Sequence, residues 1–221
     1  MTDMRRRAAE PPVGPLDIQL KPGLAEETLQ ELGPLLAEEG IDVDHIDVPD
    51  LETLQQALNR AVERHNMARF TPVGKPRELA VTTLRLVITA ITQDNTALAA
   101  QLLDQVQPES PDNSTATVAS CIGVVLGLLD QWLSTPDHQA PTRLGDRVRL
   151  PAGHWQGKRA ATDIVVLARK GRAFRSLGTL LIRQGGPQVL YGSALALAAT
   201  IQTWSAATDT PVTELTHTAV H

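Results

Sequence analysis

The sequence predicts an all-α protein, a multi-helix bundle built from helical hairpins with room for two subdomains. Apolar residues recur at helical spacing in most segments, and these segments are separated by breaks rich in Pro, Gly and Asp. Only 3% of the 221 residues are aromatic although 42% are hydrophobic, so the core must consist mainly of Leu, Val, Ile and Ala. Small aliphatic side chains of this kind favour closely packed helices.

The first part of the chain divides at its Pro and Gly residues. We expect a disordered lead-in over residues 1–20, because Pro and charged residues fill it and no apolar run follows its arginines. Leucines at helical spacing over 24–39 predict two short helices, which Gly33 and Pro34 separate. Gly40 is a natural stop for the second of these helices.

An extended stretch and two long helices come next. Partial alternation over 41–48 indicates an extended stretch or a short strand. Asp50 is suited to cap a helix over 51–66, where apolar residues recur at helical spacing. A loop then leads to Pro76, which suits the first turn of an apolar helix that reaches Ile91.

The remaining elements are also predicted to be helical. Residues 93–95 form a turn, after which a helix to Val106 folds back on its predecessor as a hairpin. Residues 114–134 are apolar nearly all round, so this helix should lie at the centre of the core. Further helices are expected over 161–183 with a break near Gly171, over 187–206, and from Pro211 onward.

Composition indicates two helical parts of opposite charge. We expect an acidic helical domain over 21–135, an irregular linker rich in Pro, Gly and Arg over 136–160, and a basic helical part over 161–221. Residues 24–66 carry eleven acids against two bases, a local net charge of -9. Residues 136–191 carry ten bases against three acids, a local net charge of +7. Such opposite fields within one chain need an account, and solvated faces or docking of the acidic part on the basic part would supply one without a ligand.

The basic segment is the candidate binding site. Arg side chains release counterions from phosphates and fork onto paired oxygens, so residues 143–183 suit nucleic acid or another polyanion. Trp155, Phe174 and Tyr191 lie among these bases and would offer a stacking surface to single strands. Polyanion binding is the second reading of this segment, and in the first reading the basic side chains are solvated or the acidic half docks on them. The candidate contact residues are Lys158, Arg159, Arg169, Lys170, Arg172, Arg175 and Arg183.

No pattern of metal ligands is complete. The acidic run 42–50 departs from a calcium-binding loop, because Ile46 stands at a ligand position and Asp47 stands where the sharp turn needs Gly. His217 and His221 have the spacing of two zinc ligands on a helix, but no third ligand lies nearby in the sequence. We therefore expect no metal and no other cofactor.

Local catalytic motifs are incomplete as well. Residues 153–159 are one residue short of a phosphate-binding loop, and the Gly-Gly-Pro run 185–187 is typical of an ordinary turn. Ser193 lacks the flanking glycines of a nucleophile elbow. Cys121 is the only cysteine, and its place in the most apolar helix predicts a buried, inert thiol. These observations argue against an enzyme.

We expect a cytoplasmic, non-enzymatic interaction or regulatory protein that binds a protein partner or a second copy of itself. A single cysteine fits a reducing compartment, and no apolar run reaches the roughly 20 residues that cross a bilayer, so no membrane partner is expected. Arg outnumbers Lys by 16 to 4, a bias that we associate with a bacterial source. Binding of nucleic acid or another polyanion through 143–183 is the alternative, and a helical enzyme without a local motif is the third hypothesis.

Overall fold

The chain divides into two compact units, Met1–Met67 and Ala68–His221. The computed structural model describes residues 33–34, 37, 40, 67–110, 114–134 and 144–221. In the first unit Gly33, Pro34 and Ala37 are helical, and Gly40 lies in a turn with a φ of 77°, as expected for a stop. The rest of the 24–39 segment, the extended stretch over 41–48, the helix over 51–66 and most of the acidic charge lie outside the described residues.

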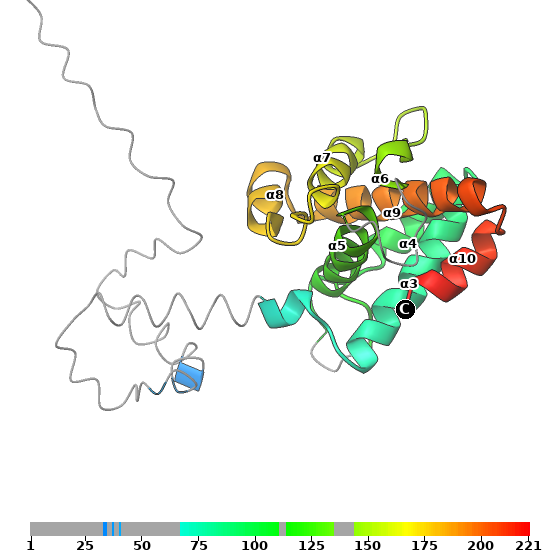
Figure 1. The fold of residues 1–221 in the computed structure, drawn as a ribbon. Helices are drawn as coiled ribbons and strands as arrows, with labels where there is room; N and C mark the ends of the chain where they lie inside the picture. Colours follow the sequence, from blue (N-terminus) through cyan, green and yellow to red (C-terminus); the bar gives the residue numbers. More distant parts are fainter. Residues whose placement is uncertain (1–32, 35–36, 38–39, 41–66, 111–113, 135–143) are drawn as a thin grey trace, which may run out of the picture. The chain divides into compact units, whose positions relative to one another are not determined.

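The second unit is helical (Figure 1). Its helices are α3 (Lys75–Thr92), α4 (Thr96–Asp104), α5 (Val118–Ser134), α6 (Leu144–Arg147), α7 (Lys158–Ala168), α8 (Leu177–Gln184), α9 (Gly186–Thr208) and α10 (Val212–Ala219). Within the described residues there is no strand, and an isolated bridge joins Gln107 to Thr117. The predicted all-α fold is confirmed.

The α3–α4 hairpin forms from local signals in the sequence. α3 has a proline in its first turn, and Asp94 turns the chain with a φ of 57°. Asn95 then caps α4, because its side-chain oxygen accepts a hydrogen bond from the backbone N–H of Leu98 at 3.1 Å. α3 and α4 pack against each other, so the predicted hairpin is confirmed.

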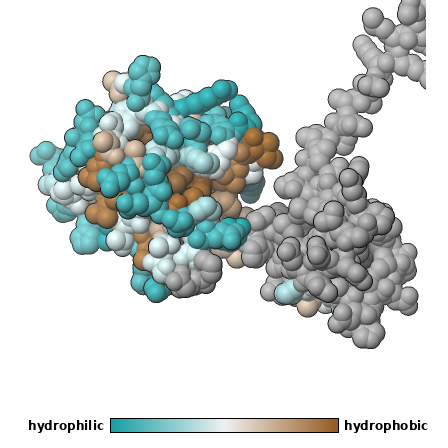
Figure 2. Space-filling view, turned by 180° about the vertical axis from the view of Figure 1, so that it is seen from behind, coloured by the Kyte–Doolittle hydropathy of each residue, from teal (hydrophilic) through white to brown (hydrophobic). Residues whose placement is uncertain are grey.

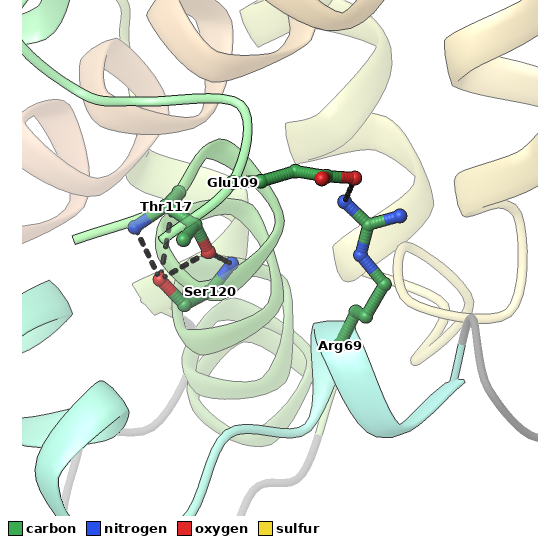
Figure 3. A network of polar contacts seen from close by, with 4 residues as sticks. All are labelled: Arg69, Glu109, Thr117 and Ser120. Atoms are coloured by element: carbon green, nitrogen blue, oxygen red, sulfur yellow. Dashed lines mark hydrogen bonds and ion pairs between the residues drawn. The ribbon is translucent and has the colours of Figure 1, made fainter. Parts of the chain in front are cut away.

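α5 begins four residues later than predicted, because a reciprocal cap fixes its start (Figure 3). The Thr117 hydroxyl oxygen accepts from the Ser120 N–H at 3.1 Å, and the Ser120 hydroxyl oxygen accepts from the Thr117 N–H at 3.0 Å. Nearby, Arg69 and Glu109 form an ion pair at 3.0 Å. Both side chains of this pair are substantially exposed, so it contributes little to stability.

α9 lies at the centre of the second unit, with the other helices gathered around it (Figure 1). It contacts α3, α5, α6, α7, α8 and α10, and residues 189–201 are buried without interruption. A helix that is apolar all round must be surrounded in this way. α5, the helix that the sequence placed at the centre, is also buried along most of its length, but it contacts fewer helices than α9 does.

Helices from both sides of the expected linker share one core. α5, from the expected acidic domain, packs on α7 and α9 from the expected basic part. α6 lies within the linker range, and its Leu144 is only 2% exposed. The N-terminal extent of the acidic domain lies outside the described residues and stays a prediction.

Small residues let α7 and α9 approach closely. A Cβ atom added at Gly192 would lie 2.5 Å from the Cβ of Ala160 and 2.8 Å from the backbone oxygen of Gly157, so no larger side chain fits there. Gly157 precedes α7 with a φ of 72°, a conformation that glycine adopts without strain. The abundance of small residues in this sequence therefore has a direct packing role.

Polar side chains cover most of the face shown in Figure 2, with separate apolar areas between them. Among the exposed large apolar residues, Val166 on α7 is 44% exposed and Ile182 on α8 is 74% exposed. None of the helices in the described part of the chain has both the length and the apolar character needed to cross a bilayer.

Candidate functional site

Seven basic residues lie on α7, on α8 and on the turn between them. Lys158 and Arg159 begin α7, four lie in or beside the turn 169–176, and Arg183 lies in the last turn of α8. We define the α7–α8 basic surface as this set, which comprises Lys158, Arg159, Arg169, Lys170, Arg172, Arg175 and Arg183.

A side-chain hydrogen bond connects the last residue of α8 to α7. The Gln184 side-chain amide donates to Asp163 Oδ2 at 2.7 Å, so the end of α8 lies beside the middle of α7. At a rise of 1.5 Å per residue, Arg159 lies about 14 Å along the helix axis from Ala168 at the end of α7, so the bases at the two ends of α7 form two groups.

Two of the seven bases already have structural partners. Lys158 Nζ donates to the Gly153 backbone oxygen at 2.9 Å. Arg169 Nε donates to the Gly145 backbone oxygen at 2.6 Å, and its Nη2 donates to that of Val148 at 3.4 Å. These contacts tie the loop before α7 and the α6 region to the basic segment, so both side chains stabilise the fold.

The other five bases are exposed and unpaired. Their side chains make no hydrogen bond or ion pair with any residue in the described part of the chain. Asp163 is the one acid between residues 158 and 183, and its carboxylate is engaged by Gln184. The five are Arg159, Lys170, Arg172, Arg175 and Arg183.

The turn that carries three of these bases is anchored to α5. Asp130 Oδ1 accepts from the Ala173 N–H at 2.8 Å, and Asp130 Oδ2 accepts from the Phe174 N–H at 2.9 Å. Gly171 has a φ of 60°, and a Cβ added there would lie 3.1 Å from Ser134 Oγ, so the turn lies close against the end of α5. Sequence reasoning missed Asp130. The signal was present, because Asp130 is the only charged residue in α5.

The three aromatic residues of this segment do not form a stacking platform. Tyr191 is 9% exposed and belongs to the core, so it cannot stack on a base. Trp155 and Phe174 are half-buried and pack against the same core. The Trp155 indole N–H donates to the Ala152 backbone oxygen at 3.1 Å, which holds the ring to its own loop.

Residues 153–159, which nearly match a phosphate-binding loop, already use backbone amides of the segment in hydrogen bonds within the protein. The Gly157 N–H donates to the Gln188 side-chain oxygen at 3.1 Å, and the Lys158 N–H donates to the Trp155 backbone oxygen at 3.2 Å. A phosphate would need such donors free. Ser193 is buried in α9, and its hydroxyl donates to the Leu190 backbone oxygen at 2.8 Å, so it is placed as a structural group.

The titratable groups with shifted pKa values lie in the core. Burial raises the pKa of the Cys121 thiol to about 12, so the thiolate does not form near neutral pH. Burial, with a hydrogen bond to Asp104 and its negative charge, raises the pKa of Tyr191 to about 12. Among the described residues no three His, Cys, Asp or Glu side chains are placed to hold a metal, and the acidic run 42–50 lies outside them.

A pocket of about 180 Å³ lies at a second place, between α3, α4, α9 and the loop before α7. Ile91 comes from α3, and residues of α4, the loop and α9 complete its wall. The lining residues are Ile91, Thr96, Ala99, Ala100, Leu103, His154, Trp155, Gln156, Tyr191 and Leu195.

The fold and the two sites thus define an all-α unit with an anchored basic surface and a separate small pocket. Comparisons of the chain with protein-family models, with curated proteins and with solved structures found no match.

Proposed function

We propose that the protein is a non-enzymatic interaction module that binds a polyanionic partner through the α7–α8 basic surface. The observation that carries this proposal is the group of five exposed bases that lack any partner in the described part of the chain. Asp163 is the only acid between them in sequence, and Asp130 of α5 lies beside the turn in space, so the five bases outnumber the acids around them.

The anchoring of the turn supports binding rather than simple solvation. The hydrogen bonds that fix this turn stabilise the fold and also hold the backbone that carries the bases in one conformation. Here Asp130 holds two amides of the turn and Arg169 holds the α6 region, so Arg172 and Arg175 project from a fixed backbone. Less conformational freedom is then lost when a partner binds.

An acidic protein surface is the partner class that we place first. Arg guanidinium groups bind carboxylates through two parallel hydrogen bonds, and four of the five unpaired bases are Arg. Val166 and Ile182 are exposed on the same two helices, which adds apolar contact area of the kind that protein interfaces use.

Nucleic acid is the second candidate partner. The inward packing of the aromatic residues indicates whether a single strand or a duplex would bind. Single-strand binding proteins stack bases on exposed rings, whereas Tyr191 is buried and Trp155 and Phe174 pack on the core. Contacts to the phosphates of a duplex require only basic side chains, with no exposed aromatic ring. We therefore expect any nucleic-acid binding to favour duplex over single strand.

The test is a binding titration of the full chain with three fluorescent probes across a salt series. The probes are a glutamate-rich peptide, a mixed-sequence duplex and a mixed-sequence single strand. We expect binding that weakens as salt rises. The triple variant Arg172→Gln, Arg175→Gln, Arg183→Gln should flatten the salt dependence of duplex binding by about two to three units of slope, since each lost phosphate contact removes about 0.9.

Two controls separate this site from general charge. The triple Arg→Lys variant at the same positions keeps the charge, so a loss of affinity there reports the forked geometry of Arg. Lys75→Gln removes one exposed base on α3 and should leave binding unchanged. Failure of all three probes to bind at low salt, or unchanged binding by the triple Gln variant, would overturn the proposal.

A further inference from the structure

We infer that the pocket between α3, α4 and α9 binds a small, neutral aromatic molecule. This site goes beyond the proposed function, because none of its lining residues belongs to the α7–α8 basic surface.

The floor of the pocket is apolar and rigid. Ile91, Leu103 and Leu195 are each less than 5% exposed, and they come from three different helices. Tyr191 adds an aromatic ring from α9 and is only 9% exposed. Packed helices hold all four side chains, so the floor exists before a ligand arrives.

The outer wall is a loop that its own hydrogen bonds hold in place. Trp155 is tied to Ala152 through its indole N–H, and the Lys158 ammonium group is tied to Gly153. The Gly157 N–H fastens the end of the loop to Gln188 on α9 at 3.1 Å. Trp155 is therefore held as an aromatic wall opposite the helices.

The volume limits the size of the ligand. A cavity of about 150 Å³ lined by Leu, Ile and Phe is known to hold benzene, whereas pockets for drug-sized molecules begin at about 300 Å³. The pocket here measures about 180 Å³, which suits a phenol or an indole and excludes a nucleotide.

The lining determines the charge of the ligand. No Lys, Arg, Asp or Glu lines the pocket, so a bound phosphate or carboxylate would have no charged partner. Thr96, His154 and Gln156 are exposed and supply polar groups at the rim. The Tyr191 hydroxyl donates its proton to Asp104 at 2.6 Å, so toward a ligand its oxygen acts as an acceptor. A neutral ring that carries an O–H or N–H donor fits these constraints.

Saturation-transfer NMR of the full chain with phenol and indole tests this inference. We expect saturable binding of both, and binding of benzoate that is weaker by at least about tenfold because of its charge. Absence of saturable binding by phenol and by indole would overturn the inference.

Two blocking variants locate the binding. Ala100→Leu adds bulk to the lining from α4, and Ala97→Leu is the matched control on the same helix, because Ala97 is exposed and does not line the pocket. Gln156→Trp blocks the exposed rim without a change in the core, so it keeps the test decisive if Ala100→Leu fails to fold. Binding should fall by at least about tenfold in each blocking variant. Unchanged binding in a folded blocking variant would show that the ligand lies elsewhere.

Discussion

The indole ring of Trp132 stands edge-on against the ring of Trp204, with centroids 5.3 Å apart and an interplanar angle of 75°. Both residues are 6% exposed and lie near the C-terminal ends of α5 and α9. An edge-to-face pair adds about 0.5–1.5 kcal/mol to the gain from burial alone. This contact joins the two most buried helices of the unit.

Replacement of either ring should destabilise the second unit. Trp132→Leu and Trp204→Leu should each lower the free energy of unfolding by about 2–3 kcal/mol, somewhat less than the 3–5 kcal/mol typical of Trp→Ala. The double variant should lose about 1 kcal/mol less than the sum, because the ring contact is lost only once. Urea unfolding measures all three values. Strict additivity would show that the edge-on contact contributes nothing of its own.

Asp130 should favour anion binding although its carboxylate is negatively charged. If only charge mattered, Asp130→Asn would remove a negative charge beside the basic turn and strengthen anion binding. We expect weaker binding instead, because Asn retains one acceptor and leaves the second amide of the turn without one. The lost hydrogen bond to a charged group is worth about 1.5–3 kcal/mol in stability.

The matched control for this prediction is Asp146→Asn, whose side chain makes no hydrogen bond among the described residues. It should leave anion binding unchanged or slightly stronger. Limited proteolysis with trypsin gives a readout that is independent of binding. Cleavage after Arg172 and Arg175 should be faster in Asp130→Asn than in the control, and equal rates would contradict the anchoring role.

Tyr191 should ionise far above the ordinary range. It is the only tyrosine in the chain, so absorbance of tyrosinate near 295 nm reports this one group. The midpoint should lie near pH 12 rather than near 10, because burial and Asp104 both disfavour the phenolate. Asp104→Asn should lower the midpoint without restoring the ordinary value, since burial is the largest cause. A midpoint near 10 in the folded protein would contradict the buried position.

This titration has a consequence for stability. The folded state holds the Tyr191 proton more tightly than the unfolded state, so the contribution to stability is fully present below pH 10. It should be lost as the pH rises from about 10 to about 12. Urea unfolding at pH 9 and pH 11 measures the difference, and Tyr191→Phe should remove this part of the pH dependence.

Cys121 should react with thiol reagents only when the unit opens. The side chain is fully buried and the pKa of its thiol is about 12. At pH 8 the native protein should therefore label slowly, at a rate set by unfolding rather than by reagent concentration. The urea-unfolded chain is the control and should label at once. Fast labelling of the folded chain would place Cys121 at the surface.

Local signals account for the elements that the sequence predicted well. Pro76 and Asn95 mark the starts of α3 and α4, and the Gly-Gly-Pro run 185–187 marks the start of α9. Each signal acts within one helical turn, so it can be read without knowledge of the fold. The start of α5 was displaced because its cap depends on a specific pair of hydroxyl groups, Thr117 and Ser120.

The geometry of the α7–α8 basic surface could not be predicted from the sequence, because contacts between residues far apart in the chain determine it. Asp130 binds amides that lie 43 and 44 positions later, and Arg169 binds a carbonyl 24 positions earlier. The helical spacing of apolar residues in the sequence does not indicate such contacts. The sequence predicted correctly that the segment is rich in bases, but only the structure distinguishes the five unpaired side chains from Lys158 and Arg169.

The central position of α9 has a consequence for synthesis. α3, α5 and α7 precede α9 in the chain, so they leave the ribosome before the helix that they all pack against. At 5–20 residues per second, roughly 4–15 s pass between completion of α5 and completion of α9. During this interval the apolar face that α5 later buries against α9 is uncovered. A nascent chain that has passed α5 but not yet finished α9 is therefore the form most exposed to aggregation.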